Sequence, residues 1–233
     1  MKQRLFVTLS LAGLAMATFG ATKPKAAIKS LNKTTIQQPT YTEWHDLQVN
    51  AINRFPLHTN FFTYLADDWV SVKDGKIVSK DILHMSKTES KYFLSLDGTW
   101  KFNWVANADQ RPTDFYKEDL DDSKWKTMNV PGNWEMNGFG DPEYVNVGFG
   151  WRGHFDQQPP AVPTKDNHVG SYRRIIDIPA NWDGKQVVAH FGSVTSNIYL
   201  YVNGKFAGYA EDSKVAAEFD ITPYLKKGKN LIA

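Results

Sequence analysis

Ile198–Tyr209 reads IYLYVNGKFAGY, and the fold class is most clearly indicated by this segment. Every second residue from Ile198 to Val202 is aliphatic and the residues between them are tyrosines, which is the period-two pattern of a half-buried β-strand. The Asn203-Gly204 pair suits a two-residue type I′ turn, because both central residues of that turn need φ > 0. We therefore expect a β-hairpin whose second strand begins at Lys205.

Short strands of the same kind are predicted along most of the chain, and helical periodicity is almost absent. The pattern predicts an all-β protein, with a β-sandwich or jelly-roll architecture. The expected strands are Trp69–Val78 (with a turn at 73–76), Tyr92–Leu96, Trp100–Trp104, Trp125–Val130, Tyr172–Ile178, Val187–Phe191 and Phe219–Ile221. Another apolar β-run begins at Leu231 and reaches Ala233, so we expect the chain to be the front part of a longer protein.

Composition limits the function classes. The net charge is only +2, so we expect no nucleic-acid partner. Cysteine is absent, which excludes a disulfide scaffold, a thiolate metal site and a cysteine nucleophile.

The first segment predicts export. Residues 1–21 combine Lys2 and Arg4 with a short apolar run and small residues after it, as a secretory signal peptide does. An uncleaved anchor is the alternative. Residues 22–40 then read as a flexible lead-in, 41–93 as an N-terminal arm that packs on the sandwich, and 94–233 as the sandwich itself. We expect a periplasmic or cell-surface location.

A long connection without regular structure precedes the strand at 172. Residues 141–170 are rich in proline and glycine, which oppose a regular helix or a central strand. Large rings, among them Trp134 just before it and Tyr144 and Trp151 within it, argue against a solvated linker. These rings either stack on sugar faces or fasten the loop to the sandwich.

No catalytic constellation is visible in the residues themselves. The six histidines are scattered, and the nucleophile, phosphate-binding and zinc motifs are missing. His190 is expected to be a satisfied residue on a strand rather than a ligand. No pair of carboxylates is marked for glycoside hydrolysis.

Five segments carry a resemblance to a known family. They are EWHDLQVNAINRFP (43–56), SLDGTWKF (95–102), VPGNWEMNGFGDPEYVNV (130–147), PPAVPTKDNHVGSYRR (159–174) and VNGKFAGYAEDSKVAAEFDITPYLKKGKN (202–230). In this order they resemble the N-terminal portion of family-two glycoside hydrolases, specifically the large bacterial lac-type β-galactosidases.

The resemblance implies a galactose-binding-domain-like jelly roll, followed by immunoglobulin-like domains and a TIM barrel that lie beyond this chain. The implied activity of the whole protein is retaining hydrolysis of terminal β-galactosides, with a β-galactoside saccharide as ligand. No catalytic residue falls within this chain. A stand-alone carbohydrate-binding module is one alternative, and a sister glycosidase such as a β-glucuronidase or β-mannosidase is another.

The resemblance also implies roles for individual residues. Asn146, in the YVNV element, is the family's amide contact to the galactosyl unit, and it offers both a donor and an acceptor. Glu43, Asp46 and Glu211 correspond to a peripheral divalent-cation site that suits Mg²⁺. The family also implies Na⁺ as a possible second cofactor and a homo-oligomer for the full-length protein.

Overall fold

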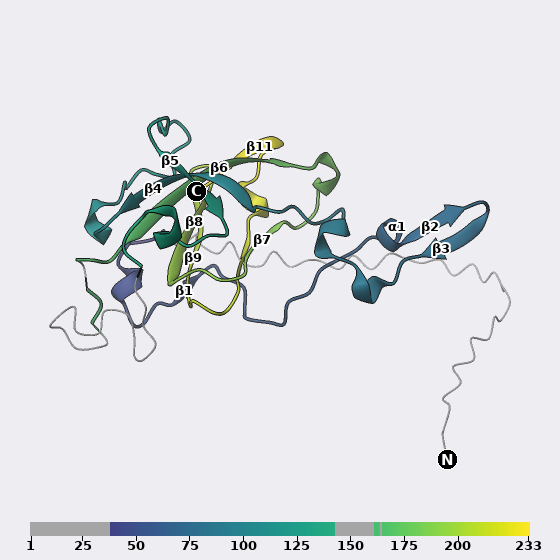
Figure 1. Ribbon diagram of the computed structural model, residues 1–233, viewed down its shortest axis with the longest axis horizontal. Coiled ribbons are helices and arrows are strands. Elements are labelled where there is room, and N and C mark those ends of the chain that lie inside the picture. The colour runs from purple at the N-terminus through teal and green to yellow at the C-terminus, as the bar shows by residue number, and fades with distance from the viewer. Residues whose placement is uncertain (1–37, 143–160, 164) are drawn as a thin grey trace, which may run out of the picture. The chain divides into compact units, whose positions relative to one another are not determined.

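The computed structural model describes residues 38–142, 161–163 and 165–233, and these residues form antiparallel β-sheets with only short helices (Figure 1). The largest sheet has seven strands. Their order across it is β1 (Ala51–Ile52), β9 (Lys205–Glu211), β8 (Asn197–Val202), β11 (Gly228–Ile232), β6 (Val169–Ile178), β4 (Gly98–Val105) and β5 (Lys126–Val130).

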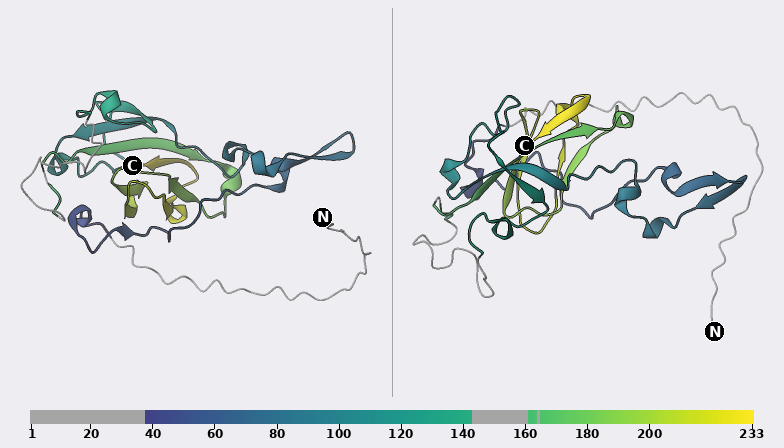
Figure 2. Two further views of the ribbon diagram at one scale, coloured as in Figure 1. Left: turned by 60° about the horizontal axis from the view of Figure 1, so that its bottom comes forward. Right: turned by 45° about the horizontal axis from the view of Figure 1, so that its top comes forward.

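A second layer covers one face of this sheet. It consists of β7 (Val188–Phe191) paired with β10 (Ala217–Asp220). Side chains from both layers meet in one apolar core, with Trp100, Leu200 and Val202 from the large sheet and Ala189 and Phe219 from the small one. Figure 2 shows the layers from two further directions. The all-β sandwich predicted from the sequence is confirmed.

The hairpin predicted at Asn203-Gly204 is confirmed. Asn203 and Gly204 have φ of 50° and 75°, so both turn residues take the left-handed conformation that a type I′ turn needs. The side chain of Asn203 is buried beneath the turn, where its Nδ2 donates to Tyr224 O at 2.8 Å and to Asn230 Oδ1 at 2.7 Å. Its Oδ1 accepts from Leu231 N at 2.9 Å, so this one amide ties the hairpin to β11.

The N-terminal arm contacts both layers. β1 extends the large sheet by pairing with β9, and Phe55 N donates to Glu218 O in β10 at 2.9 Å. The short 3-10 helices along the described chain are η1 (Glu43–His45), η2 (Ile82–His84), η3 (Lys87–Glu89), η4 (Ala108–Gln110), η5 (Glu135–Asn137), η6 (Ala180–Trp182) and η7 (Thr222–Tyr224). Within the described residues, no helix is long and apolar enough to cross a membrane.

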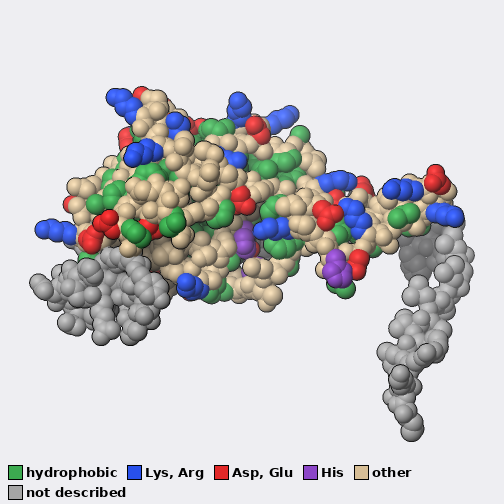
Figure 3. Space-filling model, viewed as in Figure 1, with side chains coloured by type: hydrophobic (Ala, Val, Ile, Leu, Met, Phe, Trp, Pro, Cys, Tyr) green, Lys and Arg blue, Asp and Glu red, His purple; other side chains and the backbone are tan. Residues whose placement is uncertain are grey.

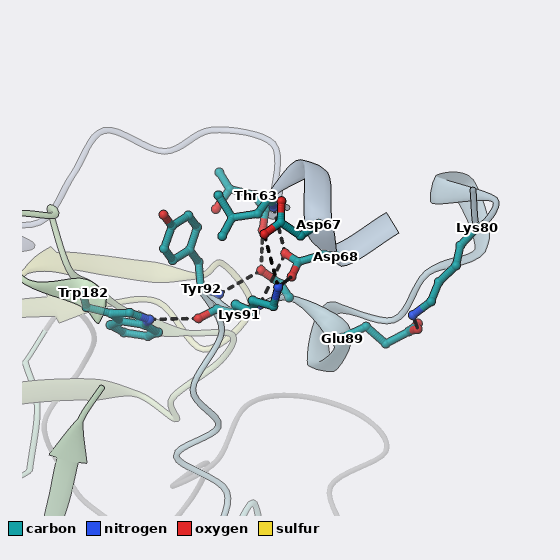
Figure 4. Close-up of polar contacts among 10 residues, drawn as sticks. Thr63, Asp67, Asp68, Lys80, Glu89, Lys91, Tyr92 and Trp182 are labelled. Carbon is teal, nitrogen blue, oxygen red and sulfur yellow. Dashed lines mark hydrogen bonds and ion pairs between the residues drawn. The ribbon is translucent and has the colours of Figure 1, made fainter. Parts of the chain in front are cut away.

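An excursion between β1 and β4 holds the helix α1 (Ala66–Trp69) and a separate hairpin, β2 (Val70–Lys73) with β3 (Lys76–Ser79). Its base is organised by the buried carboxylate of Asp68, which accepts from Leu65 N at 2.8 Å (Figure 4). The ammonium of Lys91 lies 3.7 Å from the same carboxylate. Trp182 Nε1 donates to Lys91 O at 2.9 Å, so the base of the excursion is bonded to the sandwich.

One predicted strand is wrong. Tyr92–Leu96 forms a turn followed by irregular chain rather than a strand. The amide of Tyr92 donates to Ser90 Oγ at 3.1 Å and that of Phe93 to Ser90 O at 3.2 Å, so these donors are used locally and pair with no neighbouring strand. Leu94 and Leu96 pack against the sandwich core, which explains the apolar alternation without a strand.

Candidate sugar-binding and metal sites

Asn146, the amide expected to contact the sugar, lies outside the described residues, together with Tyr144 and Trp151. The structure does describe the chain on both sides of that segment. Before the segment, η5 ends at Asn137 and is capped by Gly138, whose φ of 80° is the left-handed conformation favoured after a helix C-terminus.

Trp134 attaches the chain that precedes the undescribed segment to the sandwich. Its Nε1 donates to the hydroxyl of Tyr172 at 2.5 Å, and its ring lies 6.0 Å from that of Phe102. The indole is therefore part of the packing between η5 and β4 and β6. The sequence left two roles open for Trp134, stacking on a sugar or attaching the loop to the sandwich. The structure supports the second role.

The two sides of the segment approach each other at the end of β4. The rings of Trp104 and His168 are 4.9 Å apart, edge to face. A Cβ placed on Gly140 would lie 3.4 Å from atoms of both rings, so the backbone comes close to them at this point. Residues on either side of the segment that carries Asn146 are thus held against one strand.

Glu43 is a buried carboxylate, only 4% exposed. Its Oε1 accepts from Thr40 N at 2.6 Å and from Thr40 Oγ1 at 2.9 Å, and its Oε2 accepts from the Tyr199 hydroxyl at 2.9 Å. Burial acts to raise the pKa of Glu43, but the hydrogen bonds from Thr40 and Tyr199 outweigh it, and the pKa lies below its usual value. The group is therefore held as a carboxylate at neutral pH.

Glu211 lies at the end of β9 beside a second tyrosine. The hydroxyl of Tyr209 donates to Glu211 Oε1 at 2.5 Å, and the rings of Tyr199 and Tyr209 are 4.5 Å apart. Burial, followed by the adjacent carboxylate, raises the pKa of each tyrosine well above its usual value. Glu43 and Glu211 are thus joined through a pair of packed, protonated tyrosines.

Asp46 does not join this pair. It is exposed, and its Oδ1 accepts from Gln48 N at 2.9 Å within its own turn. Within the part of the chain that the structure describes, no group of three or more histidine, aspartate or glutamate side chains could hold a metal ion. The described carboxylates do not by themselves make up a complete Mg²⁺ ligand set, and the cation site stays a prediction.

Sequence reasoning missed the hydroxyl partners of these carboxylates. In the sequence, Tyr199 is one of two tyrosines that alternate with aliphatic residues, and nothing nearby indicates that it meets Glu43. The only signal is the alternation that puts Tyr199 and Tyr201 on one face of β8.

A family model matches residues 93–233 of the chain, and its description is "Glycosyl hydrolases family 2, sugar binding domain". The chain belongs to this family. The matched range begins shortly before β4 and continues to the last residue, so it includes every strand of the two layers except β1.

Curated relatives of this family 2 domain are similar to it over most of its length. A β-galactosidase of Halalkalibacterium halodurans is 36% identical over 187 residues, which is 79% of this chain and 17% of the relative. A β-galactosidase of Priestia megaterium is 35% identical over 83% of this chain and 18% of the relative. The chain therefore spans about a sixth of the length of these relatives.

A solved structure of a glycosyl hydrolase family 2 member from Bacteroides cellulosilyticus covers 60% of this chain and 16% of that one, with 26% identity and a TM-score of 0.41. This likeness is weak, and the family assignment rests on the sequence match.

Proposed function

We propose that this chain is the N-terminal sugar-binding domain of an exported β-galactosidase that hydrolyses terminal β-galactosides with retention of configuration. The observation that carries the proposal is the 36% identity with a β-galactosidase over 79% of this chain. The two carboxylates of a retaining mechanism, about 5 Å apart, would lie in a catalytic barrel outside this chain.

The role proposed for the domain is to present one amide to the galactosyl unit. Asn146 would donate and accept hydrogen bonds with sugar hydroxyls. The support for this role is the fixed geometry next to the segment, where Trp134, Gly140 and His168 are held against β4 and β6. A rigid base reduces the ordering cost of binding, because less freedom is lost when the sugar arrives.

The activity is tested on the full-length protein that the gene encodes. We expect hydrolysis of p-nitrophenyl β-galactoside, with much slower hydrolysis of the matching β-glucuronide and β-mannoside. The present 233-residue chain, assayed alongside, should hydrolyse none of the three. Preference for the glucuronide or the mannoside would assign a sister activity instead. A stop codon directly after Ala233 would leave a stand-alone carbohydrate-binding module.

Export and cation binding are tested separately. N-terminal sequencing of the mature protein should show that residues 1–21 have been removed. For the cation, the melting temperature of the full-length protein is compared in excess MgCl₂ and in EDTA, for the wild type and for Glu211→Gln. A rise with Mg²⁺ that the variant lacks would support a site at Glu43 and Glu211, and equal melting temperatures in both conditions would count against it.

A further inference from the structure

The hairpin of β2 and β3 has one apolar face and one face that carries lysines. Side chains alternate between the two faces of a strand, and residues paired across a hairpin share a face. The register puts Val70, Val72, Ile77 and Ser79 on one side, which we call the apolar face. The opposite side, the lysine face, consists of Ser71, Lys73, Lys76 and Val78. Alternation of this kind is typical of strands with one face buried.

The apolar face is exposed in the described chain. Val72 is 70% exposed and Ile77 is 78% exposed, although the two residues pair directly across the hairpin. Among the described strands β2 and β3 pair only with each other, and a lone two-stranded hairpin is at best marginally stable in water. Figure 3 shows hydrophobic side chains among charged ones on this excursion. Its exposed large apolar residues are Leu57, Phe61, Phe62, Val72, Ile77, Val78, Ile82 and Leu83. Exposed apolar surface of this extent marks an interaction site.

The base of the excursion holds the hairpin in place. Lys80 N donates to Trp69 O at 2.8 Å, which closes the open end of the hairpin. The ammonium of Lys80 lies 2.8 Å from Glu89 Oε1, as Figure 4 shows. The hydrogen bonds of Asp68 and Trp182 described above join this base to the sandwich. A surface that is already held in place loses little freedom when a partner binds it.

The size of the apolar face limits what can cover it. Complete burial of Val70, Val72 and Ile77 removes on the order of 300 Å² from water. A stable complex of two separate proteins buries about 800 Å² on each partner. Three side chains are therefore too few to hold a second molecule, whereas a contact within one polypeptide needs less area because its effective concentration is high. The match to the Halalkalibacterium halodurans β-galactosidase covers only 17% of that relative, so the full-length protein proposed above has further polypeptide to supply the contact.

We propose that the apolar face docks on an uncharged, apolar surface of the polypeptide that follows this domain in the full-length protein. The face carries no charged side chain, so a charged surface placed on it would lose its water without gaining a partner. Docking of this kind holds a later domain in a fixed orientation to the sandwich. The inference rests on the proposed function only in requiring a longer chain, and it does not depend on which glycoside is cleaved.

Photocrosslinking of the full-length protein identifies what covers the apolar face. The photoreactive residue p-benzoylphenylalanine replaces Ile77 in one variant and Ser71, on the lysine face, in the control. After irradiation we expect the probe at position 77 to be joined to residues beyond 233 of the same molecule, and the probe at position 71 to give few such products. Products confined to residues 1–233, a crosslinked dimer, no product, or equal yields from the two positions would each overturn the proposal. The expected product from a protein that cleaves another glycoside would refute only the proposed function.

Trypsin gives a second readout, because Lys73 and Lys76 lie in the hairpin. Val72→Ser and Val78→Ser are the same change on its two faces. In the described chain Val72 is 70% exposed and Val78 44%, so without a partner Val78→Ser should loosen the hairpin at least as much. Docking reverses this order, and in the full-length protein cleavage after Lys73 or Lys76 should be about tenfold or more faster in Val72→Ser than in Val78→Ser. Equal rates, or faster cleavage of Val78→Ser, would contradict docking through the apolar face.

Discussion

The hydroxyl of Tyr199 donates a hydrogen bond to Glu43 at 2.9 Å, although the two residues are 156 positions apart in the sequence. Glu43 belongs to the N-terminal arm and Tyr199 to β8, in the interior of the seven-stranded sheet. The bond is made at a carboxylate that is only 4% exposed, where an unpaired oxygen would be costly. It is therefore one of the contacts that make the arm part of the domain.

Tyr199→Phe should lower the free energy of unfolding by about 1–3 kcal/mol, because it removes a hydrogen bond to a buried charged group. Urea unfolding followed by fluorescence measures the change. Tyr64→Phe is the matched control, since that hydroxyl makes only a 3.3 Å contact to Met85 O, and it should have little effect. Equal stabilities of the Tyr199→Phe variant and the wild type would show that the arm does not depend on this bond.

Arg173→Met should destabilise the domain by about 3–5 kcal/mol. The guanidinium is buried, bonds Asp122 at 2.8 Å and Lys117 O at 2.8 Å, and also bonds Phe115 O. Removal of the charge leaves Asp122 and two carbonyl groups without their donor. Lys226→Gln breaks an ion pair with Glu118 that is about half exposed, and should cost less than about 1 kcal/mol. Similar losses in the two variants would contradict the importance given to burial.

A pH dependence is expected from His58, which shares the carboxylate of Glu218 with His190. His58 Nε2 and His190 Nδ1 lie 2.7 and 2.8 Å from the two oxygens of Glu218, which joins the arm, β7 and β10. The contact with Thr59 O, followed by that with Glu218, raises the pKa of His58 above its usual value of 6.5. Its stabilising effect is therefore fully present below pH 6.5 and is lost as the pH rises through the raised pKa.

His58→Gln should thus lower the melting temperature more at about pH 6 than at about pH 9. Burial acts to raise the pKa of Glu218, but the two histidines outweigh it and lower the pKa, so Glu218 is charged at both pH values. His84→Gln is the control, because that ring is mostly exposed and pairs with Asp81 in its own turn. A loss of equal size at both pH values would show that the charge of His58 is not involved.

Gly208→Ala should be strongly destabilising. A Cβ on Gly208 would lie 2.5 Å from Phe219 Cε1 and 2.7 Å from Ile52 O, so the second layer or β1 would have to shift. We expect a loss of about 1–3 kcal/mol, as for other overpacked cores. At Gly192 the nearest atom to such a Cβ is 3.9 Å away, and Gly192→Ala should be tolerated. Unfolding by urea compares the two variants, and equal losses would contradict the packing described between β9 and β10.

Local patterns in the sequence predicted most of the strands. The alternation along β4 and β8 and the Asn203-Gly204 turn are set by neighbouring residues, so they could be read without tertiary information. Tyr92–Leu96 failed for the opposite reason. Its apolar residues alternate because they pack against the sandwich, while Ser90 accepts the backbone donors that a strand would need.

The site could be predicted only in part. The YVNV element named Asn146 by resemblance, and Glu43 and Glu211 were named in the same way. The tyrosines between those carboxylates were not predicted, because the bond from Tyr199 to Glu43 joins residues 156 positions apart and the packing of Tyr199 on Tyr209 depends on how β8 pairs with β9.

We propose that this domain contributes Asn146 to a galactoside-binding pocket, and the kcat/KM of Asn146→Ala in the full-length protein tests this proposal. On p-nitrophenyl β-galactoside the value should fall by about tenfold or more, because a buried polar contact to the sugar is lost. Asn137→Ala, an exposed amide next to Gly138, should stay within about twofold of the wild type. An unchanged kcat/KM in a correctly folded Asn146→Ala enzyme would contradict the account.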